Sequence, residues 1–395
     1  MLNETNVNLG KTRSSIRELY EYGRKRKAEI GEENVFDFSL GNPSVPAPVE
    51  VKNELENLIN NTDAEVLHGY TSAQGGYGVR KKLADYTNAR FKTNLDADCI
   101  YMTCGAAASL TITLNALINA GDEVITFVPY FPEYKVFAGG AGAKLVAVES
   151  EENTFQIDLE KFKLALNDKT KAVIINSPNN PSGVVYRADT VKRLCAVLKE
   201  FSEKTGKPVY LISDEPYREL VYDKQTEVPY IMNYYARSIV CYSYSKSLSL
   251  AGERIGYIAV NNEMDEFSDV YAGICGAGRA LGFVCAPALF QKLVEKCYDK
   301  ISDISVYKRN RDTLCSALSE YGYTFVKPDG AFYLFVKALE EDAEAFAERA
   351  KKYELLLVAG CGFGASGYVR VSYCVSPEVI KRALPSFKKL AESYK

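Results

Sequence analysis

The stretch SYSKSLSLAGERIG, residues 243–256, determines how the rest of this chain is interpreted. A run of strand-forming residues, 238–242, precedes it and predicts a buried strand. Lys246 then lies between two serines, and Arg254 follows just before a second apolar run. Burial disfavours the charged form of a lysine and lowers its pKa. A neutral amine at the end of a buried strand can attack a carbonyl carbon and form an imine.

The same stretch carries groups that bind phosphate. The hydroxyls of Ser243 and Ser245 and the guanidinium of Arg254 can hold a phosphate close to Lys246. A site that binds a phosphate and forms an imine suggests pyridoxal phosphate. The alternative is an ordinary surface lysine in a serine-rich turn, and the remainder of the chain decides between the two interpretations.

Length, composition and charge exclude several classes of protein. A chain of 395 residues predicts one large domain with a smaller one. Its contents of 47% hydrophobic and 25% charged residues are typical of a soluble globular protein, and no apolar run reaches membrane-spanning length. The net charge of −3, without a basic patch, argues against a nucleic-acid partner. We therefore expect neither nucleic acid nor a membrane as a partner.

Cysteine and histidine usage narrows the class further. Ten cysteines are scattered without a Cys-x-x-Cys pair, and those in apolar stretches, such as Cys241 and Cys285, are typical of buried free thiols. Together with an N-terminus that has no apolar signal region, this predicts a protein of the reducing cytoplasm. His68 is the single histidine, which excludes a multi-histidine metal site and leaves one candidate for a Ser-His-Asp triad.

Apolar strands alternate with amphipathic helices between residues 99 and 260. Helices over 106–119 and 188–203 fit between predicted strands. This alternation predicts an α/β fold with a mainly parallel seven-stranded sheet, covered by helices on both faces. Ligands of such sheets bind at the carboxyl ends of the strands. The expected strands are 99–103, 123–127, 144–148, 172–176, 209–213, 239–242 and 255–260.

The two ends of the chain predict a smaller α+β domain. We expect residues 1–45 to form an N-terminal arm and part of the small domain, residues 46–285 the large domain, and residues 286–395 the rest of the small domain. The elements expected in these ends are a basic helix over 12–30, a strand over 36–40, a helical stretch over 291–319, hairpin-like strands around 328–333, a helix near 339–352, strands near 354–358 and 368–373, and a final helix.

Several candidate side chains follow the ends of predicted strands. Ala106 and Ala107 open a helix whose free N–H groups can face a phosphate, and close packing of helix on sheet is the alternative. Phe131, or Tyr130 beside it, can stack on a planar ring. Asn180 lies in a turn that two prolines and a glycine make rigid.

Charged residues and glycines supply further candidates. Asp214 follows a buried strand, where a carboxylate needs a cationic partner such as a protonated pyridine nitrogen. Arg370 lies among apolar residues and suits a bound carboxylate, with an internal salt bridge as the alternative. Gly41 can bring its N–H close to a ligand, although a plain turn is the alternative. Tyr70 lies in a glycine-rich loop that is a weak signal by itself.

Taken in order, these segments resemble a class I/II aminotransferase, a fold-type-I enzyme that uses pyridoxal 5′-phosphate. The resemblance runs from Phe36 to the final helix and rests mainly on residues 180–183, 214–217 and 243–256. It implies transfer of an amino group from an amino acid to a 2-oxo acid, with pyridoxal 5′-phosphate as the cofactor. The candidate amino donors are aspartate, glutamate and the aromatic amino acids.

The resemblance also implies a role for each candidate residue. Lys246 holds the cofactor as an imine and moves the proton between substrate Cα and cofactor, while Asp214 pairs with the pyridinium nitrogen. Arg370, helped by the Gly41 N–H, binds the substrate α-carboxylate. Tyr70 reaches the phosphate of the neighbouring subunit, which implies a homodimer with shared sites, and the small domain is expected to close over the site. The other implied cofactor contacts are Tyr217 and Asn180 to the ring O3′, Phe131 to the ring face, and Ala106, Ala107, Ser243, Ser245 and Arg254 to the phosphate.

Some features leave the substrate and the reaction open. Certain aspartate-specific relatives carry a lysine near the phosphate loop, and no lysine stands around Ala107. Arg279, expected in a flexible loop, is a candidate for binding a distal carboxylate across a dimer interface, with an ordinary surface or interface arginine as the alternative. The cofactor motifs are shared with C–S β-lyases and decarboxylases of the same fold. A ligand-binding regulator on this scaffold would need a DNA-binding extension, for which we expect too little sequence before the scaffold.

Overall fold

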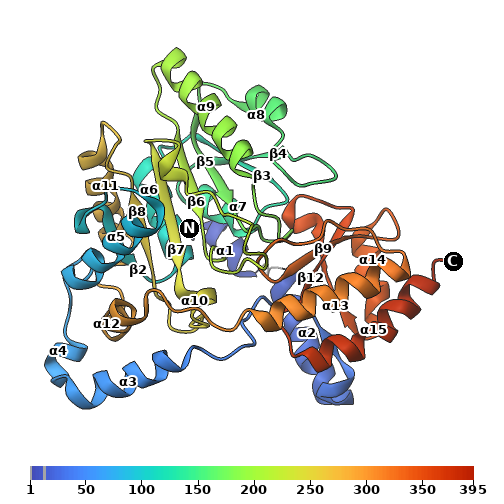
Figure 1. Ribbon diagram of the computed structural model, residues 1–395. Coiled ribbons are helices and arrows are strands. Elements are labelled where there is room, and N and C mark those ends of the chain that lie inside the picture. Colours follow the sequence, from blue (N-terminus) through green and yellow to red (C-terminus); the bar gives the residue numbers. More distant parts are fainter. Residues whose placement is uncertain (1, 12–14) are drawn as a thin grey trace.

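The computed structural model describes residues 2–11 and 15–395 and is built around one large sheet (Figure 1). Its strands follow the order β2-β8-β7-β6-β5-β3-β4. β8 runs antiparallel to its neighbours β2 and β7, and the other neighbouring pairs are parallel. The predicted mainly parallel seven-stranded sheet is therefore confirmed. The strands are β2 (Ile100–Thr103), β3 (Glu123–Val128), β4 (Lys144–Glu149), β5 (Thr170–Asn176), β6 (Tyr210–Asp214), β7 (Ser238–Ser243) and β8 (Gly256–Val260).

Both faces of this sheet are buried. Alternate residues of each strand point to opposite sides, and each side packs into its own core. In β5, Val173 and Ile175 pack into one core, whereas Ala172 and Ile174 pack into the other. Helices on both faces, as predicted, account for strands that are apolar at successive positions. The first core includes residues of α3 (Val49–Asn61), α5 (Tyr77–Phe91), α9 (Ala188–Thr205) and α12 (Ala288–Cys297), and the second includes residues of α6 (Ala106–Leu117), α7 (Glu133–Gly140) and α11 (Phe267–Ala280).

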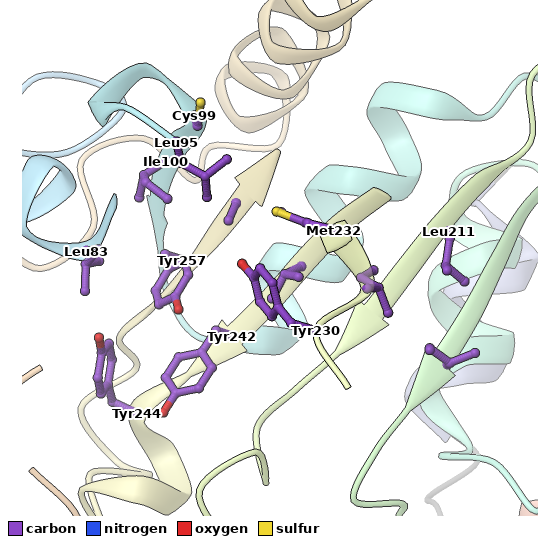
Figure 2. Close-up of a cluster of buried hydrophobic side chains, with 14 of the residues drawn as sticks. Leu83, Leu95, Cys99, Ile100, Leu211, Tyr230, Met232, Tyr242, Tyr244 and Tyr257 are labelled. Atoms are coloured by element: carbon purple, nitrogen blue, oxygen red, sulfur yellow. The ribbon is translucent and has the colours of Figure 1, made fainter. Parts of the chain in front are cut away.

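A group of tyrosines in the first core supports the end of β7 (Figure 2). Tyr242 and Tyr257 are partners on paired strands, and their rings stack with centroids 5.1 Å apart. Tyr244 packs edge-on against Tyr242, also at 5.1 Å. The Tyr242 hydroxyl donates to the Ser247 hydroxyl at 3.1 Å. This packing fixes the short helix α10 (Tyr244–Ser247), which carries Lys246.

A smaller three-stranded sheet of C-terminal strands and a separate two-stranded pair, which joins both ends of the chain, lie beside the large sheet (Figure 1). β12 pairs antiparallel with β9 and β11, and a separate parallel pair, β1 with β10, sets Phe36 opposite Leu355. Phe38 and Val45 share a core with Leu334 and other C-terminal residues. The elements are β1 (Phe36–Asp37), β9 (Tyr333–Lys337), β10 (Leu355–Leu356), β11 (Val358–Ala359), β12 (Tyr368–Ser372), α2 (Ser15–Ile30), α13 (Ser305–Tyr321), α14 (Ala343–Lys351) and α15 (Pro377–Glu392).

Shorter helices complete the described chain. Across the two described ranges, no helix combines the length and the apolar character that crossing a membrane requires. These shorter helices are α1 (Glu4–Lys11), α4 (Ala64–His68), α8 (Leu159–Ala165) and the 3₁₀ turns η1 (Glu32–Asn34), η2 (Ala97–Cys99), η3 (Ile231–Asn233) and η4 (Gly360–Phe363).

Two predicted elements are shorter than expected because of side-chain and long-range hydrogen bonds. The strand predicted over 36–40 ends at Asp37, since the Asp37 carboxylate accepts bonds from both the backbone N–H and the hydroxyl of Ser39 and turns the chain. The helical stretch predicted over 291–319 is interrupted between α12 and α13. There the N–H of Ser302 donates to the carbonyl oxygen of Ser247 at 2.8 Å, which ties this segment to α10.

Two other predictions concern the ends of the chain. The helix predicted over 12–30 is present from Ser15, and residues 12–14 lie outside the described part. Phe325 forms an isolated antiparallel bridge with Val336 of β9, so the hairpin-like strands predicted around 328–333 are present in a short form, with β9 beginning at Tyr333. Before it, Gly330 forms an isolated bridge with Val221, and a Cβ at Gly330 would lie 2.4 Å from the carbonyl oxygen of Leu220. Close backbone approach to the segment after β6 therefore shapes the turn between the two paired segments.

The central strands should respond strongly to loss of packing. Leu211 in β6 is completely buried, whereas Leu164 on α8 is 87% exposed. We expect Leu211→Ala to lower the free energy of unfolding by about 2–5 kcal/mol, because it removes apolar contacts and leaves a cavity. Leu164→Ala, the matched control, should change it by less than about 0.5 kcal/mol. Urea unfolding of the cofactor-free proteins measures both, and equal effects would contradict the packing described for the sheet.

Candidate functional site

A cavity of about 290 Å³ lies at the carboxyl ends of β5, β6 and β7. Asn176, Asp214 and Ser243, the last residues of these strands, all line it. The first turn of α6 and residues from both ends of the chain complete the wall. The cavity brings together the candidate site residues expected from the sequence except Tyr70, Arg279 and the alternative ring contact Tyr130, namely Gly41, Ala106, Ala107, Phe131, Asn180, Asp214, Tyr217, Ser243, Ser245, Lys246, Arg254 and Arg370.

Lys246 extends into this cavity from α10. The capping residue Ser243 accepts a hydrogen bond from the N–H of Ser245 at 3.2 Å, which satisfies the start of the helix. The Lys246 amine donates to the carbonyl oxygen of Gly41 at 2.6 Å. Burial, reinforced by the charges of Arg254 and Arg370, lowers the pKa of Lys246 to about 8. A nucleophilic neutral amine is therefore accessible near physiological pH.

The wall beside Lys246 is suited to an anion. α6 begins at Ala106 without a side-chain cap, so the N–H groups of its first turn, including that of Ala107, have no partner within the helix. Arg254 donates from Nη1 to the Ser245 hydroxyl at 3.4 Å. Gly105 has a φ of 89°, and a Cβ there would lie 2.9 Å from Arg254 Nη2. The glycine thus leaves room for the guanidinium, and the wall offers amide, hydroxyl and guanidinium donors of the kind that bind phosphate.

Asp214 supplies a buried carboxylate to the lining of the cavity. Its Oδ2 accepts a hydrogen bond from the Tyr134 hydroxyl at 2.5 Å, whereas its Oδ1 has no hydrogen-bond partner among the residues that the structure describes. Burial raises the pKa of Asp214 to about 7, against the opposing effect of the Tyr134 bond. A buried carboxylate oxygen without a partner is unfavourable, and a protonated ring nitrogen would satisfy it.

Arg370 is a buried cation that has no carboxylate beside it within residues 2–11 and 15–395. Its guanidinium donates to Asn180 Oδ1 at 3.1 Å and to the carbonyl oxygen of Ser39 at 2.6 Å, and its Nε has no acceptor. Burial lowers the pKa of Arg370, and the acidic groups near it in the described residues are phenols and a thiol. Since a buried arginine favours a bidentate carboxylate, this part of the cavity is suited to an anionic substrate group.

Aromatic and amide groups line the space between these charges. Phe131 lines the cavity and packs edge-on against Tyr134 with ring centroids 5.7 Å apart, whereas Tyr130 is not part of the lining. The Tyr217 hydroxyl lies 2.8 Å from the Tyr333 hydroxyl. The donor set as a whole fits pyridoxal 5′-phosphate: an amine for its aldehyde, an anion wall for its phosphate, and the unpartnered Asp214 oxygen for its ring nitrogen.

Several residues of the site were missed by the sequence analysis. Asn176 ends β5 and donates from its amide to the Asp214 carbonyl oxygen at 2.8 Å, and its position at a strand end was a usable signal. Tyr134 lies one helical turn after Phe131, but nothing in the local pattern separates it from a core tyrosine. Ile16 and Tyr333 line the cavity from distant parts of the chain, and no local signal indicates them.

Tyr70 and Arg279 lie outside the cavity of their own chain. Tyr70 is 97% exposed, and Arg279 is also exposed. The prediction that Arg279 lies in a flexible loop is wrong, because it occupies the last turn of α11. The nearby Gly278 permits close packing, since a Cβ there would lie 2.2 Å from the Tyr101 hydroxyl. The small residues thus reflect helix–strand contact rather than flexibility.

The Tyr134–Asp214 bond generates a test that needs no cofactor. We expect Tyr134→Phe to raise the pKa of Asp214 above about 7, because the ionised carboxylate loses its hydrogen-bond donor. A bond to a charged group is worth about 1.5–3 kcal/mol, which corresponds to roughly 1–2 pH units. The carboxyl infrared band, assigned with Asp214→Asn, reports the titration in the cofactor-free protein.

Tyr186→Phe is the matched control for this test. Tyr186 is likewise buried, and its hydroxyl makes no hydrogen bond to Asp214. Its substitution should leave the pKa of Asp214 unchanged. A Tyr134→Phe titration that coincides with that of the unchanged protein would show that the phenol does not stabilise the carboxylate.

Comparison with known proteins gives a consistent result. The sequence matches the family described as "Aminotransferase class I and II" over residues 33–387. It is 30% identical over 389 residues to the probable aspartate aminotransferase of Methanocaldococcus jannaschii, covering 96% of this chain and 97% of that protein. It is also 30% identical to the aspartate aminotransferase of Thermotoga maritima, covering 96% of this chain and 97% of the relative.

Solved structures show the same relationship in three dimensions. An aminotransferase from Eubacterium rectale superimposes with a TM-score of 0.98 at 53% identity, covering 100% of this chain and 99% of the other. The aspartate aminotransferase of Thermotoga maritima gives a TM-score of 0.85 over 96% of this chain and 97% of its own. The fold is thus that of fold-type-I enzymes, whose aspartate aminotransferase members use pyridoxal 5′-phosphate. From the family match, the relatives and the site together, the chain belongs to the class I and II aminotransferases.

Proposed function

We propose that Lys246, Asp214 and Arg370 carry the aminotransferase reaction in this chain, at the carboxyl edge of the large sheet. The observation that supports this most directly is the Lys246 amine, whose pKa is lowered to about 8 inside a cavity that also presents an anion wall, a buried carboxylate and a buried guanidinium. Bound pyridoxal 5′-phosphate supplies an aldehyde and an electron-withdrawing ring. The protein supplies binding, orientation and proton transfer.

Each residue then has a defined task. Lys246 accepts and returns the proton of the substrate Cα, for which its lowered pKa is suitable. Asp214 holds a proton on the ring nitrogen, and Arg370 with the Gly41 N–H binds the substrate α-carboxylate. We assign the remaining contacts of the cofactor to Tyr217 and Asn180 at the ring O3′, Phe131 at the ring face, and Ala106, Ala107, Ser243, Ser245 and Arg254 at the phosphate.

The amino donor is proposed from the cations at the cavity and from the named relatives. Among the described residues, the cations that line the cavity are Lys246, Arg254 and Arg370, and each already has a task. A distal carboxylate would therefore need another cation. The relatives named aspartate aminotransferase favour a dicarboxylic substrate, and Arg279 of a neighbouring subunit is our candidate for binding it, with an aromatic amino acid as the alternative substrate.

We also propose a homodimer in which the small unit closes over the site. Tyr70, at 97% exposure, is free to reach the phosphate in a neighbouring cavity. Because α12 packs against α3 and α5, we propose that the large unit runs from residue 46 to the linker 298–304 rather than ending at 285, and that residues 1–45 and the chain after the linker form the small unit. The ten free cysteines agree with a cytoplasmic location.

Borohydride reduction of the loaded enzyme tests the assignment of Lys246. We expect the cofactor to be fixed on the peptide that contains Lys246, because its amine is the one whose pKa is lowered at the cavity. A single half-reaction with an amino acid should convert the cofactor to pyridoxamine phosphate with loss of the visible absorption. Label on another lysine would show that Lys246 is not the residue that holds the cofactor.

The same half-reaction separates the alternatives that share the cofactor site. A C–S β-lyase would release pyruvate and ammonia, and a decarboxylase would release carbon dioxide. The named relatives favour the aminotransferase over these enzymes and over a ligand-binding regulator.

Subunit mixing tests the shared site. We expect a mixture of Lys246→Ala and Tyr70→Phe subunits to regain activity, because one of the two sites in the heterodimer contains neither substitution. The expected recovery is about one quarter of the unchanged activity after random exchange, since half of the dimers are mixed and each has one intact site. Activity that never exceeds that of the separate variants, with exchange verified by mass spectrometry, would show that Tyr70 serves its own chain or neither site.

A further inference from the structure

Tyr333 is a lining residue of the cavity to which neither the family motifs nor the proposed roles assign a task. It is the first residue of β9, is 2% exposed, and lines the cavity. It contacts three groups that have proposed tasks: Tyr217, Arg370 and Gly41. The inference below rests on those proposed tasks.

The hydroxyl of Tyr333 is committed to Tyr217. The two oxygens lie 2.8 Å apart, and either can be the donor. If Tyr217 donates its proton to the ring oxygen of the cofactor, its own oxygen must accept, so Tyr333 becomes the donor of the pair. Hydrogen bonds in such a chain polarise one another, and a donated bond makes Tyr217 a stronger donor in turn.

The ring of Tyr333 supports Arg370 at the same time. The guanidinium carbon lies 4.7 Å from the ring centroid of Tyr333 and 5.0 Å from that of Phe363, so the planar cation contacts aromatic rings at two points. The guanidinium also donates to Asn180 and to the carbonyl oxygen of Ser39. These contacts set the direction in which the remaining N–H groups of Arg370 point.

Gly41 shows how tightly the hydroxyl is placed. A Cβ built on Gly41 would lie 1.9 Å from the Tyr333 hydroxyl oxygen and 2.8 Å from the adjoining ring carbon. Gly41 does not have a positive φ, so its backbone would tolerate an alanine. The position is therefore suited to glycine because the Tyr333 hydroxyl occupies the space of a side chain.

We propose that Tyr333 is a positioning residue with two separable actions. Its hydroxyl orients and polarises Tyr217, and its ring holds the Arg370 guanidinium in the orientation that binds the substrate carboxylate. The hydroxyl acts on the cofactor through Tyr217, and the ring acts on every α-amino acid through Arg370. The two actions therefore appear in different measurements.

Visible absorption of the loaded enzyme reports the hydroxyl. By strengthening the bond from Tyr217 to the ring oxygen, Tyr333 should favour the deprotonated form of the bound chromophore. Tyr333→Phe should therefore move the midpoint of the absorption titration to higher pH, by roughly 0.3–1 unit, or about 2- to 10-fold in proton affinity. Because the ring remains, KM for amino acids should stay within about 2-fold.

Substitution of the ring reports the second action. Tyr333→Leu should show the same titration shift and in addition raise KM about 10-fold for both a dicarboxylic and an aromatic amino acid, since Arg370 loses one aromatic contact. Gly41→Ala approaches the hydroxyl from the other side and should reproduce the titration shift with Tyr333 still present. It keeps the experiment decisive if Tyr333→Phe fails to fold.

Tyr323→Phe is the matched control. Tyr323 is buried in the same core, and its hydroxyl donates to the carbonyl oxygen of Phe387 at 2.9 Å, away from the cavity lining. It should lower the thermal midpoint without moving the absorption titration.

A titration midpoint equal in Tyr333→Phe, Gly41→Ala and the unchanged enzyme would overturn the hydroxyl action, and an unchanged KM in Tyr333→Leu would overturn the ring action. If the unchanged protein binds no cofactor, the proposed function itself fails, and this result is visible before any variant is made.

Discussion

Three basic side chains gathered around one small cavity are the constraint on which the rest of the structure depends. Lys246, Arg254 and Arg370 line this space, and in the described chain Asp214 is the carboxylate that lines it with them. Moving charges out of water is unfavourable unless opposite charges compensate. The protein alone compensates only partly, because one N–H of Arg370 and one oxygen of Asp214 remain without partners. Burial, together with the charges of Arg254 and Arg370, lowers the pKa of Lys246, so the reactivity of this amine and the unfavourable burial of charge have one origin.

The distance between the basic groups is maintained by backbone contacts between the two parts of the chain. The carbonyl oxygen of Gly183 accepts the N–H groups of Asp329 and Gly330 at 3.0 and 2.9 Å, and the Asp329 carboxylate accepts the N–H of Val185 at 3.1 Å. Asn180, in the same turn as Gly183, accepts from Arg370. The turn after β5 therefore joins the large sheet, which carries Asp214, to the small sheet, which carries Arg370.

The sequence predicted the features that depend on residue type at the end of a strand. The seven strands of the large sheet were apolar runs, and charged residues such as Asp214 and Lys246 stood out beside them. Tyr134 and Tyr333 could not be identified in this way, because the chain has 28 tyrosines and a buried tyrosine that contacts a carboxylate or an arginine has the same local pattern as one in the core. Arg279 was misplaced for a related reason, since the packing of Gly278 on Tyr101 is visible only in three dimensions.

The pairing of β1 with β10 has a consequence for how the protein is made. Phe36 pairs with Leu355, so this strand is synthesised about 320 residues before its partner. At about 5–20 residues per second this interval lasts roughly 15–60 s. The large sheet, whose strands lie between residues 100 and 260, can assemble during that time, while Phe38 and Val45 remain without their core. Contacts between segments far apart in sequence form slowly. During synthesis, the part of the cavity wall that carries Arg370 in β12 therefore follows the strands of the large sheet.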